Sequence, residues 1–206
     1  MWCCQRDSFC PRKGRNLIAQ ILGSVTLFRM MHELDVWLME GVRGGRCPYC
    51  KGPLHLATYQ RKANGSRVDL PDKYRNRYSL CCGNPDCRKR VLPPSSLFMG
   101  RRSTYQCAIL VGLTLWQSGQ KSAQALSEML DVDVRTIFRW AAYFRDGFPK
   151  SPLWQTIRGR VPVEIHMGRL PGLLLTVFVR RARDALNGVM ACIWFLLGMP
   201  DREHAG

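Results

Sequence analysis

The chain has 206 residues, with 31 Lys and Arg against 15 Asp and Glu, and a formal net charge of +16 at pH 7. Hydrophobic residues make up 46% of it, which excludes an intrinsically disordered polycation. A compact chain with this surplus repels itself unless it meets a polyanion, so nucleic acid is the first partner to consider and an anionic membrane the second. The apolar runs 173–179 and 189–199 are shorter than the roughly 18–20 residues needed to span a bilayer, which disfavours a membrane protein.

Ten cysteines lie at positions 3, 4, 10, 47, 50, 81, 82, 87, 107 and 192. We interpret the first three as free thiols and Cys107 and Cys192 as core residues of apolar helices. The apolar stretch 17–28 is followed by charged residues and not by a small-residue cleavage site, so it does not indicate a signal peptide. We therefore expect a reducing, cytoplasmic compartment, where paired cysteines more often bind metal than form disulfides.

The first two segments in chain order are a tail and a helix. Residues 1–15 are rich in Cys and Arg without periodicity, and we expect a poorly ordered tail. Within residues 16–42, apolar side chains recur at helical spacing between Asn16, which can cap a helix, and Gly41, which can end one.

The next three segments predict an α+β protein, with a small β-rich zinc ribbon followed by a helical helix-turn-helix domain and flanking N- and C-terminal helices. Residues 43–102 hold the cysteine pairs, turn formers such as Asn64-Gly65, and short alternating stretches typical of strands. Residues 103–158 have apolar side chains spaced by three and four. Residues 159–206 combine a Pro- and Gly-interrupted linker with a helix from about 173 to 197, broken near Gly188.

Two cysteine pairs in the third segment form the strongest motif. Residues 47–50 read Cys-Pro-Tyr-Cys, and residues 82–87 read Cys-Gly-Asn-Pro-Asp-Cys. Each can form a tight turn that presents two thiolates to one ion, which is the construction of a zinc ribbon. We expect one structural Zn²⁺, because four cysteines leave no open position for a catalytic water. The predicted ligands are Cys47, Cys50, Cys82 and Cys87.

The adjacent cysteines Cys81 and Cys82 leave one ligand open to question. Neighbouring side chains on a strand point to opposite faces, so only one of the two can meet the metal. We favour Cys82, because it gives the more compact turn around Asn84-Pro85, and place Cys81 in a small core.

Positive charge is concentrated around these pairs. Residues 43–102 contain fourteen Lys and Arg against three Asp, a net of +11 in sixty residues. Arg88, Lys89 and Arg90 directly follow the last predicted ligand, and Arg101 and Arg102 close the segment. Such a surface favours the phosphate backbone of nucleic acid, where affinity comes from counterion release.

Residues 122–145 predict two helices joined by a short turn. Asp131 stands at the turn position that requires a left-handed backbone, Val132 fills the space between the helices, and Asp133 caps the second helix. Ile137 and Trp140 then face inward. Three side chains, Arg135, Thr136 and Arg139, are left on or near the outward face at the start of the second helix, where a helix-turn-helix protein contacts base edges.

These motifs together resemble the zinc-ribbon and helix-turn-helix front end of bacterial insertion-sequence transposases, over about residues 47–158. The resemblance implies duplex DNA as ligand, a transposase or other mobile-element protein as a further partner, and association with the bacterial nucleoid in the cytoplasm. The DNA-binding residues it indicates are Arg88, Lys89, Arg90, Arg101, Arg102, Arg135, Thr136 and Arg139. Asp131 departs from the pattern, because that family usually has Gly there.

We expect no enzymatic activity. Transposases of this kind place three acidic residues on a ribonuclease-H-like sheet, whereas the acids after residue 158 are Glu164, Asp184, Asp201 and Glu203, none at the end of a convincing strand. Two alternatives stay open. One is a DNA-binding fragment or subunit of a split transposase. The other is a zinc ribbon that binds RNA or protein, with a helix pair that only packs.

Overall fold

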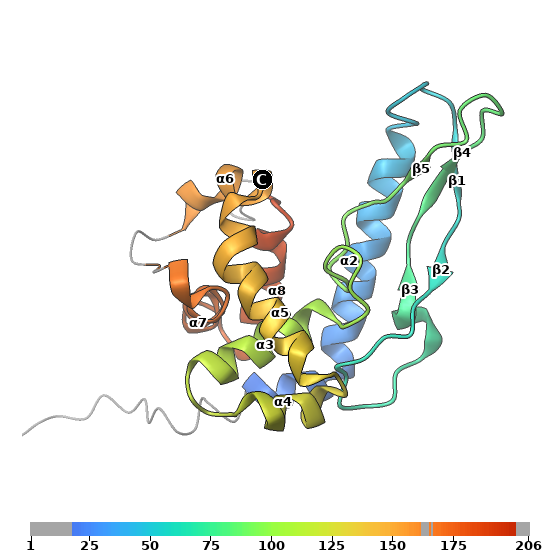
Figure 1. The fold of residues 1–206 in the computed structure, drawn as a ribbon. Helices are drawn as coiled ribbons and strands as arrows, with labels where there is room; N and C mark the ends of the chain where they lie inside the picture. Colours follow the sequence, from blue (N-terminus) through green and yellow to red (C-terminus); the bar gives the residue numbers. More distant parts are fainter. Residues whose placement is uncertain (1–17, 162–164, 166, 201–206) are drawn as a thin grey trace, which may run out of the picture.

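A computed structural model of the chain describes residues 18–161, 165 and 167–200. The predicted tail, residues 1–15, lies outside the described residues, as do Asn16 and the acids Glu164, Asp201 and Glu203. The fold mixes helices with small antiparallel sheets, as the α+β expectation requires. It forms an elongated arm beside a helical body (Figure 1).

The arm is built on one long helix, α2 (Val25–Gly44). Its buried side chains include Leu27, Phe28, Met31 and Leu38, whose spacing by three, four and seven puts them on one face. Ser24 caps the helix by accepting a hydrogen bond from the backbone N–H of Leu27. The helix therefore starts later than the sequence suggested, after a short 3₁₀ turn (η1, Ile21–Gly23), and it continues past Gly41.

A long interrupted hairpin runs alongside α2. Its two strand pairs are antiparallel, with β1 on β4 and β2 on β3, and β5 adds a third strand next to β4. Figure 1 shows the strands beside α2 along the arm. The bounds are β1 Leu54–Leu56, β2 Tyr59–Gln60, η2 Asp72–Arg75, β3 Asn76–Arg77, β4 Leu80–Cys82 and β5 Arg90–Val91. Residues 74–78 alternate in sequence as a strand does, yet Tyr74 and Arg75 belong to the 3₁₀ turn η2 and only Asn76 and Arg77 to a strand.

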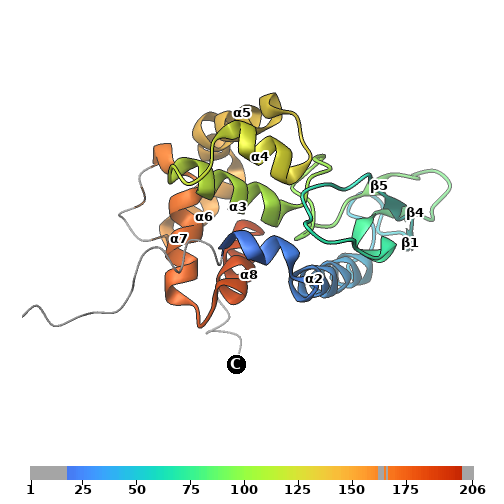
Figure 2. The same ribbon diagram turned by 90° about the horizontal axis from the view of Figure 1, so that it is seen from below.

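The body is arranged around α3 (Gln106–Gln117), which is buried from Gln106 to Leu115. A helix buried on all sides must be covered on all sides, and α3 contacts α4, α5, α7 and α8 (Figure 2). The remaining elements are α4 Ala123–Leu130, α5 Val134–Ala142, η3 Tyr143–Gly147, η4 Phe148–Lys150, α6 Pro152–Ile157, η5 Arg158–Arg160, η6 Met167–Arg169, α7 Gly172–Arg181 and α8 Ala185–Leu196.

The predicted C-terminal helix is two helices. The break falls between Arg181 and Ala185, where Asp184 caps α8, and not near Gly188. Gly188 lies inside α8 and allows α7 to approach closely, because a Cβ there would sit 2.5 Å from the Cα of Val179. No described helix combines the length and apolarity that crossing a membrane requires.

Two separate cores stabilise the two parts. The large core joins the body to the base of the arm, and a small one lies at the far end of the arm, formed by Met39, Cys47, Leu54, Leu80 and Cys82. Five buried side chains provide little hydrophobic stabilisation. The far end therefore needs a further constraint to hold its shape.

Candidate metal centre and nucleic-acid interface

The four predicted ligands meet at the far end of the arm. The Sγ atoms of Cys47, Cys50, Cys82 and Cys87 all lie within 4.8 Å of one another, and among the described residues they are the one group that could hold a metal ion. The Sγ atoms of Cys50 and Cys82 are 3.4 Å apart, and those of Cys47 and Cys87 are 3.8 Å apart. A tetrahedral Zn²⁺ with bonds of about 2.3 Å to sulfur would separate its sulfurs by about 3.8 Å. The donor set and its geometry fit zinc.

The alternation of β4 decides between the two adjacent cysteines. Leu80 and Cys82 face the small core, while Cys81 points to the other side and is excluded from the cluster. This alternation places Cys82 with the ligands, as predicted. The expectation that Cys81 lies in the small core is wrong, because Cys81 is half-buried on the opposite face of the strand from Leu80 and Cys82.

Both cysteine turns are fixed by the backbone. In the first, the N–H of Lys51 donates to the carbonyl of Cys47, and in the second the N–H groups of Cys87 and Arg88 donate to the carbonyl of Asn84. Gly52 packs against the cluster, because a Cβ there would lie 3.2 Å from the Sγ of Cys82.

The thiols do not ionise equally in this setting. Burial opposes ionisation of Cys47, yet hydrogen bonds from the backbone N–H groups of Cys50 and Tyr49 outweigh it and lower its pKa to about 7. Burial and the neighbouring thiols raise the pKa of Cys82 to about 12. One thiolate forms readily near neutral pH, and further thiolates need a cation to offset their mutual repulsion.

The α4–α5 helix pair has the turn that the sequence predicted. Asp131 adopts a left-handed backbone (φ 52°, ψ 56°), and the Ser127 hydroxyl donates to the carbonyl of Val132. The Asp133 side chain caps α5 by accepting from the backbone N–H of Arg135 at 2.7 Å. Ile137 and Trp140 are buried.

A groove of about 650 Å³ lies along the start of α5. One wall comes from the helix pair, including Asp133, Thr136 and Arg139, and the other from the loop 101–104 that leads into α3. The Arg139 guanidinium donates to the Thr136 hydroxyl at 2.7 Å, so the two side chains act as one polar unit. The lining residues are Asn64, Arg101, Arg102, Ser103, Thr104, Asp131, Val132, Asp133, Thr136, Arg139 and Trp140.

Two contacts from the arm hold this groove in shape. The Asn64 side chain donates to the carbonyl of Asp131, so the loop of the hairpin touches the turn of the helix pair. The next residue, Gly65, has a φ of +90° and no Cβ, and both are needed here, because a Cβ would come within 2.6 Å of Ala108. The Arg61 guanidinium donates to the carbonyls of Arg102 and Gly100, which fixes the loop carrying Arg101.

The predicted arginines of this region are not equivalent. Arg101, Arg135 and Arg139 are exposed, whereas Arg102 is half-buried with its guanidinium 4.3 Å from the ring centroid of Tyr143. Burial lowers the pKa of Arg102, although Tyr143 partly offsets this. Arg102 therefore serves in part to fasten the loop to the body.

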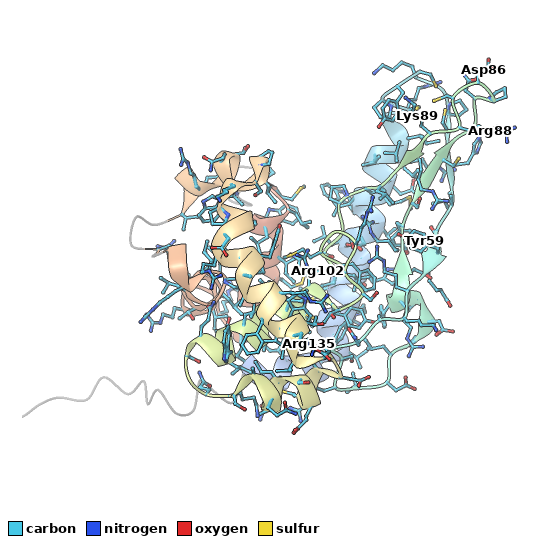
Figure 3. The ribbon with its side chains drawn as sticks, viewed as in Figure 1. Tyr59, Asp86, Arg88, Lys89, Arg102 and Arg135 are labelled. Carbon is cyan, nitrogen blue, oxygen red and sulfur yellow. The ribbon has the colours of Figure 1, made fainter. Side chains whose placement is uncertain are left out.

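The other predicted cations lie elsewhere. Arg88 and Lys89 are at the far end of the arm, whereas Arg102 and Arg135 lie where the arm meets the body (Figure 3). Arg90 stacks over the ring of Tyr59 at 5.9 Å from its centroid. Sequence proximity suggested one basic surface, and the structure separates it into two.

The sequence prediction did not include Asn64 in the groove or Arg46 and Lys51 at the end of the arm. In the sequence, Asn64-Gly65 indicates only a turn, because its contacts depend on the tertiary fold.

No protein-family description matches the chain, and neither the curated proteins nor the solved structures compared with it gave a match.

Proposed function

We propose that this protein is a non-enzymatic, zinc-stabilised DNA-binding protein in which α4 and α5 act as a helix-turn-helix and α5 enters the major groove of duplex DNA. The observation that carries the proposal is the groove that the α4–α5 helix pair and the loop 101–104 form together. It brings the exposed polar unit of Thr136 and Arg139 on α5 next to Arg101 of the facing loop.

The chemistry of the groove suits contact with bases as well as with phosphate. An arginine can bind guanine O6 and N7 with two hydrogen bonds, and a threonine can contact several bases. Arg139 and Thr136 lie in the first two turns of α5, the part of a recognition helix that reaches base edges. Arg101, on the opposite wall, would contact the adjacent phosphate.

Zinc has a structural role in this proposal. Cys47, Cys50, Cys82 and Cys87 would hold one ion and provide no open coordination position. Its binding would join the two cysteine turns and stabilise the far end of the arm, which has only a small core of its own.

We further propose that the protein serves a mobile element, on the strength of the motif resemblance to insertion-sequence transposases. The cysteine pairs and the α4–α5 helix pair support that relation. A separately encoded transposase is the partner it suggests.

Selection of bound duplexes from a random pool tests the function directly. The proposal expects enrichment of a defined sequence, with affinity for it that falls steeply as salt increases. Tighter binding to single-stranded RNA than to any duplex would contradict it, and so would the absence of enrichment.

A further inference from the structure

The groove itself is nearly balanced in charge. Its lining contains Arg101, Arg102 and Arg139 against Asp131 and Asp133. Nonspecific affinity for DNA depends on the number of phosphates that cations neutralise. The groove therefore has a net charge of only +1 and offers few phosphate contacts, although the whole chain has a net charge of +16.

The far end of the arm has the opposite character. We call it the tip and define it as residues 46–51 and 83–89. It exposes Arg46, Lys51, Arg88 and Lys89, and Asp86 is its one acid. Among the described residues, none of these four cations forms an ion pair within the chain, whereas nearby Arg43 pairs with Glu40.

Three of the tip cations stand at backbone positions that favour glycine. Arg46, Lys51 and Arg88 have φ of 62°, 61° and 43°. Lys51 and Arg88 directly follow the second cysteine of the first and second turn, respectively, and Arg46 directly precedes the first cysteine of the first turn. A side chain costs stability in this left-handed region relative to glycine. Strain of this kind points to a function of the side chain, here its charge.

The tip also holds these charges in place. The backbone hydrogen bonds of both cysteine turns fix the positions of Lys51 and Arg88. Tyr49 is 62% exposed, and the Lys89 ammonium lies 4.3 Å from the centre of its ring. Cations on a rigid frame lose less conformational freedom on binding than cations on a mobile tail.

The length of α2 sets the distance between tip and groove. Its C-terminal end leads directly to Arg46, and its N-terminal end lies at the base of the arm, where the carbonyl of Leu22 accepts from the N–H of Arg67. Twenty helical residues span about 30 Å. One turn of B-DNA measures about 34–36 Å and about 10 base pairs, so a separation of about 30 Å corresponds to about 9 base pairs, or a little less than one helical turn.

We infer that the tip is a second DNA contact, a phosphate-binding surface formed by Arg46, Lys51, Arg88 and Lys89 that grips the same duplex about one helical turn away from the groove. This inference rests on the proposed function and adds a division of labour to it. The groove reads sequence, and the tip supplies most of the salt-dependent affinity.

Hydroxyl-radical footprinting of the full-length, zinc-loaded protein on a selected duplex tests the inference. The wild type should protect two backbone tracts about 9 base pairs apart. The variant Arg46→Gly/Lys51→Gly/Arg88→Gly removes three charges and gives each position the residue it favours, so it should bind zinc and unfold no earlier in urea than the wild type. It should lose only the distal tract, and the salt slope of binding should fall by up to about three units.

A charge-matched control is Arg180→Ala/Arg181→Ala/Arg183→Ala at the end of α7, which should keep both tracts and the full salt slope. The inference is overturned, with the proposed function left standing, if the wild type protects a single tract or if the glycine variant keeps both. Failure of the wild type to protect any duplex would overturn both.

Discussion

The carboxylate of Asp35 on α2 accepts hydrogen bonds from both the backbone N–H and the hydroxyl of Ser96. The hydroxyl of Ser95 donates to the same carboxylate, and Asp35 is only 1% exposed. These bonds fasten the segment that follows β5 to the long helix of the arm. That segment continues into the loop 101–104, so the contact connects the frame of the arm to the groove.

Replacing Asp35 with Ala should destabilise the protein by about 2–4 kcal/mol, because it leaves buried donors without an acceptor. Urea unfolding measures the change in free energy. Glu33→Ala, at an exposed site on the same helix, is the control and should cost less than about 0.5 kcal/mol. Similar losses of unfolding free energy in both variants would show that the hydrogen bonds of Asp35 do not stabilise the protein more than an exposed side chain does.

The same carboxyl should make stability depend on pH. Burial raises the pKa of Asp35 above its usual 3.8, against the opposing effect of hydrogen bonds from Ser95 and Ser96 and of nearby Arg77. An acid with a raised pKa holds its proton more tightly in the folded state, so the wild type loses stability as pH rises from about 4 through the raised value. Asp35→Asn removes this titration, and the difference in unfolding free energy should shift in favour of the variant over that range. If the difference in unfolding free energy between the wild type and Asp35→Asn stays constant from pH 4 to pH 8, folding does not raise the pKa of Asp35.

The purified protein should contain about one zinc per chain by elemental analysis. Cys47→Ser and Cys87→Ser should lose it, and chelation should unfold the far end of the arm, because the small core there is insufficient alone. Cys81→Ser is the matched control and should keep the metal, since that side chain points away from the cluster. Loss of zinc from Cys81→Ser with retention in Cys82→Ser would refute the ligand set.

Two glycines in helices should respond oppositely to alanine. Gly188→Ala should destabilise the protein by about 1–3 kcal/mol, because its Cβ would overlap the backbone of Val179. Gly41→Ala on α2 meets nothing within 4 Å and should stabilise by about 0.5–1 kcal/mol through helix propensity. Thermal or urea unfolding separates the two, and a gain in stability for Gly188→Ala would show that α7 and α8 do not pack this closely.

Much of the fold could be predicted where local chemistry decides the outcome. The spacing of cysteine pairs and the alternation of β4 predicted the four clustered thiols, and Asp133 marked the start of α5. These features depend on neighbours within a few residues, so the sequence contains the needed information.

Other features required the tertiary structure. The break before Ser24 and the break after Arg181 replace longer predicted helices, because packing and caps decide where a helical pattern stops. The left-handed backbone at Lys51 and Arg88 is invisible in the sequence, since glycine is the usual marker of that conformation. The separation of the basic residues into groove and tip follows from the length of the arm, which no run of charges reveals.

If the groove at the start of α5 recognises duplex DNA, Arg139→Ala should lose sequence preference. The affinities of Arg139→Ala for the selected duplex and for a scrambled duplex are compared with those of Arg181→Ala. Arg181 is an exposed arginine on α7, so its replacement removes the same charge. Arg139→Ala should weaken binding to the selected duplex by about 5- to 150-fold and bring the ratio of the two affinities toward one. Arg181→Ala should leave that ratio unchanged. Equal losses on both duplexes for Arg139→Ala, or no loss at all, would contradict recognition of duplex DNA by the groove.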